Sequence, residues 1–460
     1  MAESNTIAFP GEAAANSSTL RMLVSLSRHG SRRPNPIAKY LCPNNHNNSE
    51  TYLVPPAQLT QLGMQQMRAV GEEVRREYVT KQGYLSSSIS GPTREHFETY
   101  FRSDSADRCA QSAISMGYGL YPDGTGPEGF PHQPIAVYMQ LIRNEHDFAA
   151  TEGPCQAISE SDVDKYFETR AQELIKEHAP MLETVGQLCG INIWDIPTMT
   201  HGEDIVTGIK DIADAFTFDT QHGLPRMAGL TPALQAEIEG LAFQNLMERY
   251  YSTPEEITYW VAGFPFLLLD NLKVSDSPSF KYYSYHGHRE LLHGMGMLLG
   301  WTIDFDGEPR AMNNTALHPA TTMFFELHQE NESTTPFVRA FMWSPQTNRT
   351  AVKLGKCSVM DCPLDEFTAI ITDHIQATGT WEEICDYTPA TFAPVVHDTT
   401  KSPPTAAASL RMPLDKTHHV KGMNVFAHSD FGWVVLSALI AVIFYVAIKY
   451  RRRHSVYRSL

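Results

Sequence analysis

Apolar positions in the first part of the chain alternate between strand-like and helix-like spacing. A continuous apolar run over residues 20–27 predicts a short buried strand. Residues 59–79 instead place their apolar side chains on one helical stripe, with charged residues opposite. Further strands are expected over residues 96–103 and 134–142, with a helix over 106–121 between them. This alternation predicts an α/β domain, a layered sheet with helices on both faces.

The second part of the chain changes character twice. A helical pattern dominates from about residue 160 to 262, and it predicts a smaller helical insertion domain over about residues 150–265. Its apolar stripes are formed by Ile205, Ile209, Ile212 and Phe216 and by Leu234, Ile238 and Leu241. Strand-like and helix-like patterns then return. We expect a strand over 280–286, a helix over 289–300, a hairpin over 321–343 and a helix over 364–375.

The C-terminal region predicts a membrane anchor. Residues 393–430 are rich in Thr, Pro, Ser and Ala, which is typical of a stalk after a domain of residues 18–392. The next residues are apolar and uncharged, and they predict a single transmembrane helix over 431–449. The cations that follow place a tail of residues 450–460 in the cytosol. The alternative, a buried core helix, is disfavoured because no element follows it to pack against.

Composition narrows the class of protein. The formal net charge of -16 argues against nucleic-acid binding, which needs a basic face. Five glycosylation sequons favour a secreted or lumenal domain. They are at Asn16, Asn47, Asn313, Asn331 and Asn348. Residues 1–20 contain no ordinary signal peptide. Either the start codon is misplaced or the C-terminal anchor directs insertion, which would leave residues 1–430 in the cytosol; we favour the first.

Positive charge gathers directly after the first predicted strand. The stretch contains Arg28, His29, Gly30, Arg32 and Pro34. Two arginines four residues apart around a bend can direct their guanidinium groups at one tetrahedral anion, and a histidine between them would touch the same anion. Ligand sites of open α/β sheets lie beyond the carboxyl ends of strands. The alternative interpretation is a basic surface loop.

The stretch Arg28–Pro34 resembles the Arg-His-Gly-x-Arg-x-Pro signature of the histidine acid phosphatases. The resemblance covers about residues 20–390. It includes LTQLG at 59–63, FRSDSADRC at 101–109 and KCSVMDCPLDEF at 356–367. It implies a phosphoglycerate mutase-like fold and hydrolysis of phosphomonoesters with no cofactor and no metal.

The resemblance also implies roles for individual residues. His29 corresponds to the nucleophile that forms a phosphohistidine, while Arg28, Arg32 and Arg108 correspond to the residues that hold the equatorial phosphate oxygens. Fixed cations suit this reaction because charge spreads over those oxygens in the transition state. Arg108 has the alternative of being a surface arginine on a helix, and Arg33 is interpreted as a solvated neighbour.

One residue of the family's pattern is missing. Histidine acid phosphatases carry a later His-Asp pair, in which the His binds phosphate and the Asp protonates the leaving oxygen. In KYYSYHGHRELL, His286 stands at the His position, but the Asp position is Gly287. Either Glu290 or His288 is then the tentative proton donor.

Two His-Asp dipeptides elsewhere are weaker candidates for this pair. His146-Asp147 lies in RNEHDF, and His397-Asp398 lies in VVHDTT. The dipeptide His397-Asp398 is followed by Thr-Thr, as in the family's motif. However, the next residues are KSPP, which cannot begin the helix that should follow the pair.

Seven cysteines leave at least one unpaired. Cys357 and Cys362 are close enough in sequence to bridge a tight loop, and the resemblance implies a second pair, Cys155–Cys385. No partner is apparent for the others, Cys42, Cys109 and Cys189. No CxxC or His/Cys cluster in the sequence indicates a metal site.

These patterns lead to one preferred hypothesis and two alternatives. We expect a single-pass membrane acid phosphatase with its catalytic domain in an endosomal or lysosomal lumen or at the cell surface. It would act on a small phosphomonoester or a phosphoprotein, and a homodimer is conceivable. In the tail, Tyr457 and Leu460 fit a sorting signal for an adaptor. A pseudophosphatase that binds phosphorylated ligands without turnover is the alternative, and phosphoglycerate mutase-like transfer fits the membrane anchor poorly.

Overall fold

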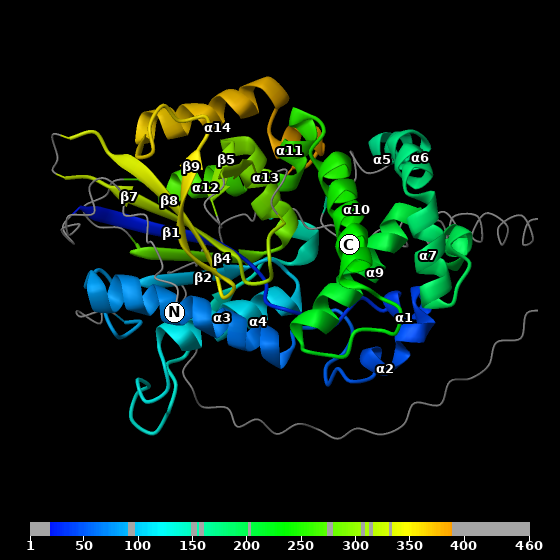
Figure 1. The fold of residues 1–460 in the computed structure, drawn as a ribbon. Helices are drawn as coiled ribbons and strands as arrows, with labels where there is room; N and C mark the ends of the chain where they lie inside the picture. The colour runs from blue at the N-terminus through cyan, green and yellow to red at the C-terminus, as the bar shows by residue number, and fades with distance from the viewer. Residues whose placement is uncertain are drawn as a thin grey trace, which may run out of the picture. The chain divides into compact units, whose positions relative to one another are not determined.

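One mixed sheet runs through the described part of the chain, and the first apolar run supplies one of its inner strands (Figure 1). The computed structural model describes residues 19–90, 97–148, 154–155, 161–200, 204–273, 279–304, 309–311, 316–330 and 334–388. The strands are β1 (Leu20–Arg28), β2 (Thr99–Ser103), β3 (Val137–Tyr138), β4 (Tyr282–Gly287), β5 (Trp301–Asp304), β6 (Pro309–Ala311), β7 (Thr322–His328), β8 (Phe337–Ser344), β9 (Thr347–Leu354) and β10 (Cys362–Pro363). Their order is β3-β2-β4-β1-β7-β8-β9-β5-β6, and β10 pairs with β8.

The sheet has a parallel half and an antiparallel half. Strands β1, β4, β2 and β3 are parallel, whereas β7 pairs with β1 in the antiparallel direction and begins the other half. Within the parallel half, Arg28 lies opposite Gly287 and Ser103 opposite His286. The carboxyl ends of β1, β4 and β2 therefore meet at one edge, where ligand sites of α/β sheets are found.

Helices cover both faces of this sheet (Figure 1). Helices α3 (Gln61–Val74) and α4 (Asp107–Leu120) pack on one face, and α12 (Phe264–Asn271), α13 (Arg289–Leu299) and α14 (Leu364–Thr378) lie on the other. Side chains of β1 are shared between the two cores: Leu23 points to the α3–α4 side, while Val24 and Leu26 point to the other. Burial on both faces explains why β1 is almost continuously apolar.

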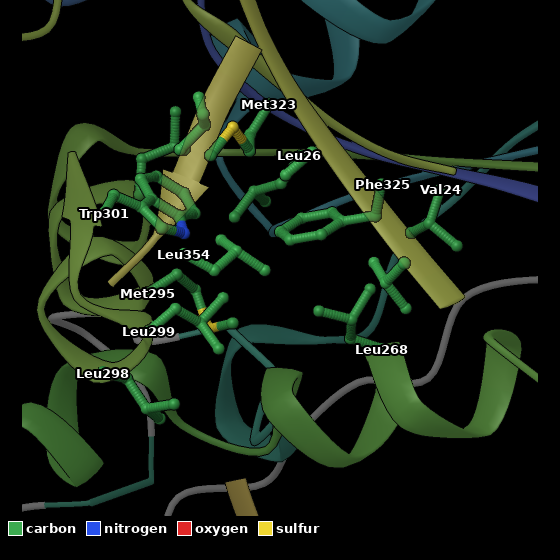
Figure 2. Packing of buried hydrophobic residues seen from close by; sticks show 14 of the residues in the cluster. Val24, Leu26, Leu268, Met295, Leu298, Leu299, Trp301, Met323, Phe325 and Leu354 are labelled. Atoms are coloured by element: carbon green, nitrogen blue, oxygen red, sulfur yellow. The ribbon is translucent and has the colours of Figure 1, made fainter. Parts of the chain in front are cut away.

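Figure 2 shows the core between the sheet and helices α12 and α13. Trp301 and Phe325 are buried there beside Leu26, Met295 and Leu299. Burying one such side chain stabilises the fold by about 1.5–3 kcal/mol. This packing fixes α13, whose first residue follows directly on the carboxyl edge of the sheet.

A separate helical core lies beside the sheet edge. The helices of this region are α1 (Ala38–Leu41), α2 (His46–Ser49), α5 (Ser161–Glu168), α6 (Arg170–Glu177), α7 (Ala179–Cys189), α8 (Ile196–Met199), α9 (Ile205–Gln221) and α10 (Pro232–Tyr250). Their core contains both predicted apolar stripes, and Leu41 and Cys42 from the early part of the chain join it. The next helix, α11 (Pro254–Val261), packs against α13, so the chain has already returned to the sheet layer. Helix α15 (Trp381–Ile384) follows α14.

The described residues contain three disulfides, two of which join distant parts of the chain. The two predicted bridges, Cys155–Cys385 and Cys357–Cys362, are present. A third joins Cys42 to Cys189 across a separation of 147 residues, and Cys109 is a buried free thiol. A bridge that closes so long a loop typically stabilises a protein by about 2–5 kcal/mol.

Most predicted elements appear, with shifted boundaries. The helix expected over 59–79 is α3, continued by a π-helix over Arg75–Lys81, and the predicted hairpin is β7–β8. The strand expected over 134–142 shrinks to β3, because it is an edge strand with one partner. Strands β5, β6 and β9 were not predicted, since β5 and β6 are short and β9 is half polar.

The predicted stalk, the transmembrane segment 431–449 and the tail lie outside the described residues. Among the helices that the structure describes, none combines the length and apolar character needed to span a bilayer.

Candidate active site

Strands β2, β4 and β1 are neighbours in the sheet and end at the same edge (Figure 1). Charged residues stand at or just after the end of each strand. The His29 amide donates to the Gly287 carbonyl at 3.0 Å, and the Asp104 amide donates to the His286 carbonyl at 3.0 Å. The three segments involved are Arg28–Arg32 after β1, Asp104–Arg108 after β2 and His288–Glu290 after β4. These backbone bonds hold them in one site.

The imidazole of His29 is buried, with 4% of its surface exposed. Its Nδ1 lies 2.7 Å from the carbonyl oxygen of Gly30. A carbonyl can only accept a hydrogen bond, so Nδ1 carries the proton, and Nε2 of the neutral ring keeps its lone pair. Burial, followed by the positive charges of Arg108 and His288, lowers the pKa of His29 well below its ordinary value. The His29 ring is therefore neutral and held in one orientation, which is what a nucleophilic imidazole requires.

Gly30 allows the loop to approach helix α3 closely. A Cβ at Gly30 would lie 2.3 Å from the carbonyl oxygen of Gly63, and a Cβ at Gly63 would lie 2.1 Å from that of Ser31. The Gly30 amide donates to the Ser112 hydroxyl at 3.2 Å. Because only glycines fit this contact, the backbone beside His29 is fixed against α3 and α4.

The positive charges of Arg108, Arg28 and Arg32 act on His29. Arg28 donates to the Leu317 carbonyl, and its pKa is lowered to about 9 by burial and by the neighbouring Arg289. Arg32 is also buried, and Arg108 is half-buried on the first turn of α4. Within the described residues, the buried Nε atoms of Arg28 and Arg108 have no hydrogen-bond partner. Buried donors without acceptors around a neutral imidazole suit an anionic ligand.

Asp214 connects this cation cluster to the helical core. It lies on α9, and its carboxylate is 3.1 Å from Arg32 Nη2 and 3.4 Å from Arg289 Nη1. Burial alone would raise the pKa of Asp214, but Arg289, Lys210 and Arg32 lower it well below its ordinary range. An ionised Asp214 thus offsets part of the repulsion among the arginines and fixes two of them.

The structure corrects the predicted position of His286. This side chain is 0% exposed, its Nε2 lies 2.9 Å from the Ser284 hydroxyl, and its ring stacks on Phe101. Burial lowers the pKa of His286 to about 3. Strand β4 continues to Gly287, so the residue that reaches the strand end is His288, two positions later. His286 is thus fully buried in the sheet, and among the described residues its Nδ1 has no hydrogen-bond partner.

His288 takes the place expected of His286. Its ring packs edge-on against His29, with centroids 5.2 Å apart. Its Nε2 is 2.9 Å from the Asp104 carboxylate and 3.3 Å from Arg108 Nη2. Burial alone would raise the pKa of Asp104, but the charge and hydrogen bond of His288 more than offset this effect and lower it. Asp104 is therefore an ionised acceptor that orients the imidazole, a residue that the sequence analysis did not single out.

Arg289 follows His288, so the pair His-Asp expected from the family becomes His-Arg here. Glu290 pairs with Arg289 at 3.2 Å. Burial alone would raise the pKa of Glu290, but Arg289 and then His288 lower it to about 2. Glu290 is thus ionised in mildly acidic solution and has no proton to donate, which leaves His288 of the two tentative donors.

The remaining predicted site residues lie elsewhere. Asp147 pairs with Arg102 at 2.6 Å and with His146 at 3.7 Å, after strand β3. Arg33 donates to the Val54 carbonyl at 2.9 Å. Of the five sequons, Asn47 and Asn348 are exposed. The residues Asn16, Asn313, Asn331, His397, Asp398, Tyr457 and Leu460 lie outside the described residues.

Comparison with known proteins identifies the class. Residues 19–342 match the model of the histidine phosphatase superfamily (branch 2), and the chain belongs to this superfamily. Human prostatic acid phosphatase is 23% identical over 370 residues, which cover 76% of this chain and 84% of the relative. Mouse lysophosphatidic acid phosphatase type 6 is 26% identical over a match that covers 72% of this chain and 71% of the relative. A lysosomal acid phosphatase of Xenopus laevis is 33% identical over 31% of each chain.

Solved structures agree on the fold. The phytase of Citrobacter braakii superposes with a TM-score of 0.58 at 16% identity, covering 77% of this chain and 98% of the phytase. A phytase of Klebsiella sp ASR1 also superposes with a TM-score of 0.58. It is 17% identical, and the match covers 78% of this chain and 96% of the phytase. The chain thus has the histidine phosphatase fold, and its family is one of phosphoric monoester hydrolases.

Proposed function

We propose that this protein hydrolyses phosphomonoesters at acid pH through a phosphohistidine on His29. The single observation that carries the proposal is the hydrogen bond from His29 Nδ1 to the Gly30 carbonyl, which leaves the Nε2 lone pair among three arginines. Fixed cations stabilise the charge on the equatorial oxygens of a phosphoryl group in transfer. Arg28, Arg32 and Arg108 provide these cations.

The first step forms the phosphoenzyme. The lone pair of His29 Nε2 forms the N–P bond while the ester P–O bond breaks. Because Nε2–H of His288 is directed at Asp104, Nδ1 is the atom that gives a proton to the leaving oxygen. The leaving group departs as an alcohol, and His288 keeps its proton on Nε2.

The second step releases phosphate. A water molecule gives its proton to Nδ1 of His288 and attacks the phosphorus. The P–N bond breaks, inorganic phosphate leaves, and Nε2 of His29 regains its lone pair. One imidazole thus acts first as an acid and then as a base.

Trapping the intermediate tests the proposal. The full-length protein is mixed with a phosphomonoester labelled in the phosphoryl group and quenched in alkaline denaturant, in which phosphohistidine survives. We expect label on the protein that is stable in alkali, is lost in acid and maps to His29. Turnover without such label, or label on another residue, would refute the mechanism.

Arg289 favours one alternative, a pseudophosphatase. A cation stands where the family carries its proton-donating carboxyl, and the site could bind a phosphorylated ligand without turning it over. The same trapping experiment separates the two proposals. Binding of inorganic phosphate with neither label nor product would support the alternative.

The pH profile provides a second test. Burial is the largest cause of the lowered pKa of His29, and the charge of Arg108 is the next. Arg108→Gln removes a positive neighbour, so the pKa of His29 should rise. The acid limb of kcat/KM against pH should then move to higher pH. Arg68→Gln, an exposed arginine paired with Glu72, is the control and should leave the limb in place. An unmoved limb in Arg108→Gln would contradict the proposed neighbourhood of His29.

We further propose that the catalytic domain faces an acidic lumen, held by residues 431–449. Three disulfides are typical of oxidising compartments, and the sequons at Asn47 and Asn348 are exposed. The relatives include proteins named as lysosomal and prostatic acid phosphatases.

We expect the protein to stay in membranes after an alkaline carbonate wash and to lose mass with N-glycosidase. A variant truncated before residue 431 should appear in the soluble fraction. Release of the full chain by carbonate would exclude the anchor.

A further inference from the structure

A carboxylate, a thiol and an imidazole meet at the carboxyl ends of β2 and β4. Asp104 follows β2, Cys109 lies in the first turn of α4, and His288 follows β4. Their ligand atoms all lie within 4.8 Å of one another. The His288 Nε2 is 2.9 Å from the Asp104 carboxylate and 3.9 Å from the Cys109 sulfur. The sequence separates these residues, so no motif spacing indicates the cluster.

We propose that Asp104, Cys109 and His288 form a binding site for a borderline-soft divalent cation such as Zn²⁺, and that the bound ion switches the enzyme off. Tetrahedral zinc binds sulfur at about 2.3 Å and imidazole nitrogen or carboxylate oxygen at about 2.0–2.2 Å. Donor atoms around the ion are then about 3.6 Å apart for S and N, and about 3.4 Å for N and O. The observed separations differ from these by a few tenths of an ångström, which small side-chain rotations can supply.

The type and burial of the donors select the ion. Thiolate and imidazole favour zinc over Mg²⁺ or Ca²⁺, which take oxygen ligands. Asp104 and Cys109 are buried, while 20% of the His288 side chain is exposed toward solvent. An ion would therefore enter past His288. Coordination replaces the S–H bond of Cys109 by an S–metal bond and releases that proton to solvent, and a fourth position remains for water.

Binding would stop turnover through His288, a consequence that rests on the proposed function. The ion binds Nε2 in the tautomer of His288 that carries its single proton on Nδ1, so Nε2 no longer donates to Asp104. The metal-bound ring cannot become doubly protonated, and loss of its remaining proton would leave an imidazolate, so His288 no longer acts as the general acid. His29 and the three arginines keep their contacts, so we expect kcat to fall more than phosphate affinity.

Metal binding can be measured without relying on activity. Full-length, untagged protein is titrated with ZnCl₂, and Co²⁺ is used as an optical probe. We expect one Zn²⁺ per chain and a thiolate-to-cobalt charge-transfer band in the near ultraviolet. Cys109→Ser should abolish the band and weaken zinc binding by more than about 100-fold. Ser115→Ala, which changes another buried polar residue of α4, is the matched control and should bind zinc as the wild type does.

Activity then tests the switch. Zinc should inhibit the wild type and Ser115→Ala. The rate of Cys109→Ser, compared with and without zinc, should not change, whatever its level relative to the wild type. Cys109→Ala serves if the serine variant misfolds. Absence of stoichiometric binding, a cobalt spectrum without the thiolate band, or equal affinity in Cys109→Ser would overturn the site. Zinc bound at Cys109 in an active enzyme with unchanged kcat would overturn the switch. His29→Ala should still bind zinc, so failure of the proposed hydrolysis is distinguishable from failure of this site.

Discussion

Replacing His29 by alanine should lower kcat by about 10⁴–10⁶-fold on every phosphomonoester, comparable to the loss of a catalytic nucleophile in other enzymes. The reason is that the variant has no Nε2 lone pair to attack phosphorus. The arginines remain in place, but cations alone only stabilise a transition state that now requires direct attack by water. Steady-state rates and the alkaline trapping experiment measure the effect, and the trapped label should disappear as well.

The control for this variant is His46→Ala. His46 is an exposed histidine whose closest charged contact is Glu50 at 4.0 Å. It should leave kcat unchanged. Protection of His29→Ala from thermal unfolding by inorganic phosphate would show that the variant is folded and keeps its anion site. A His29→Ala enzyme that retains normal turnover would remove the mechanism altogether.

The second large effect concerns the leaving group. His288→Ala should reduce the rate on an alkyl phosphate by about 10²–10⁴-fold, which is the usual contribution of a general acid. The rate on p-nitrophenyl phosphate should fall much less, because nitrophenolate leaves without a proton. The diagnostic quantity is the ratio of the two rates, measured at about pH 5 with the full-length protein.

Two further variants distinguish the roles of Asp104 and Glu290, which both lie near His288. Asp104→Asn should show the same leaving-group dependence in weaker form, because Asp104 acts by orienting His288. Glu290→Gln should keep the wild-type ratio, since the Glu290 carboxylate is engaged with Arg289. If Glu290→Gln changed the ratio and His288→Ala did not, the proton donor would be Glu290.

The sequence alone predicted much of the scaffold. The apolar run before Arg28 formed a buried strand, and the amphipathic stripe ending at Tyr78 formed a helix packed on it. Such patterns are local and directly reflect burial, so they can be read without the fold. The cation motif could also be placed, because a strand end in an α/β sheet has a known relation to ligand sites.

The sequence pattern could not show which residues reach the site when this depends on where a strand ends or on contacts between distant segments. His286 and His288 both occur in one short stretch, and only the true end of β4 decides which of them reaches the site. Asp104 and Cys109 meet His288 through the pairing of β2 with β4, a contact between residues about 180 positions apart. The Cys42–Cys189 bridge likewise depends on how the helical core closes. Pairings at such separations require the three-dimensional structure.

The contact between Asp214 and Arg32 joins residues 182 positions apart, because Arg32 follows β1 and Asp214 lies on α9. The charge of the guanidinium groups at the sheet edge is therefore partly offset by a carboxylate from a neighbouring helix. We expect that loosening α9 from this edge would lower phosphate affinity, because Arg32 and Arg289 would lose the partner that holds them.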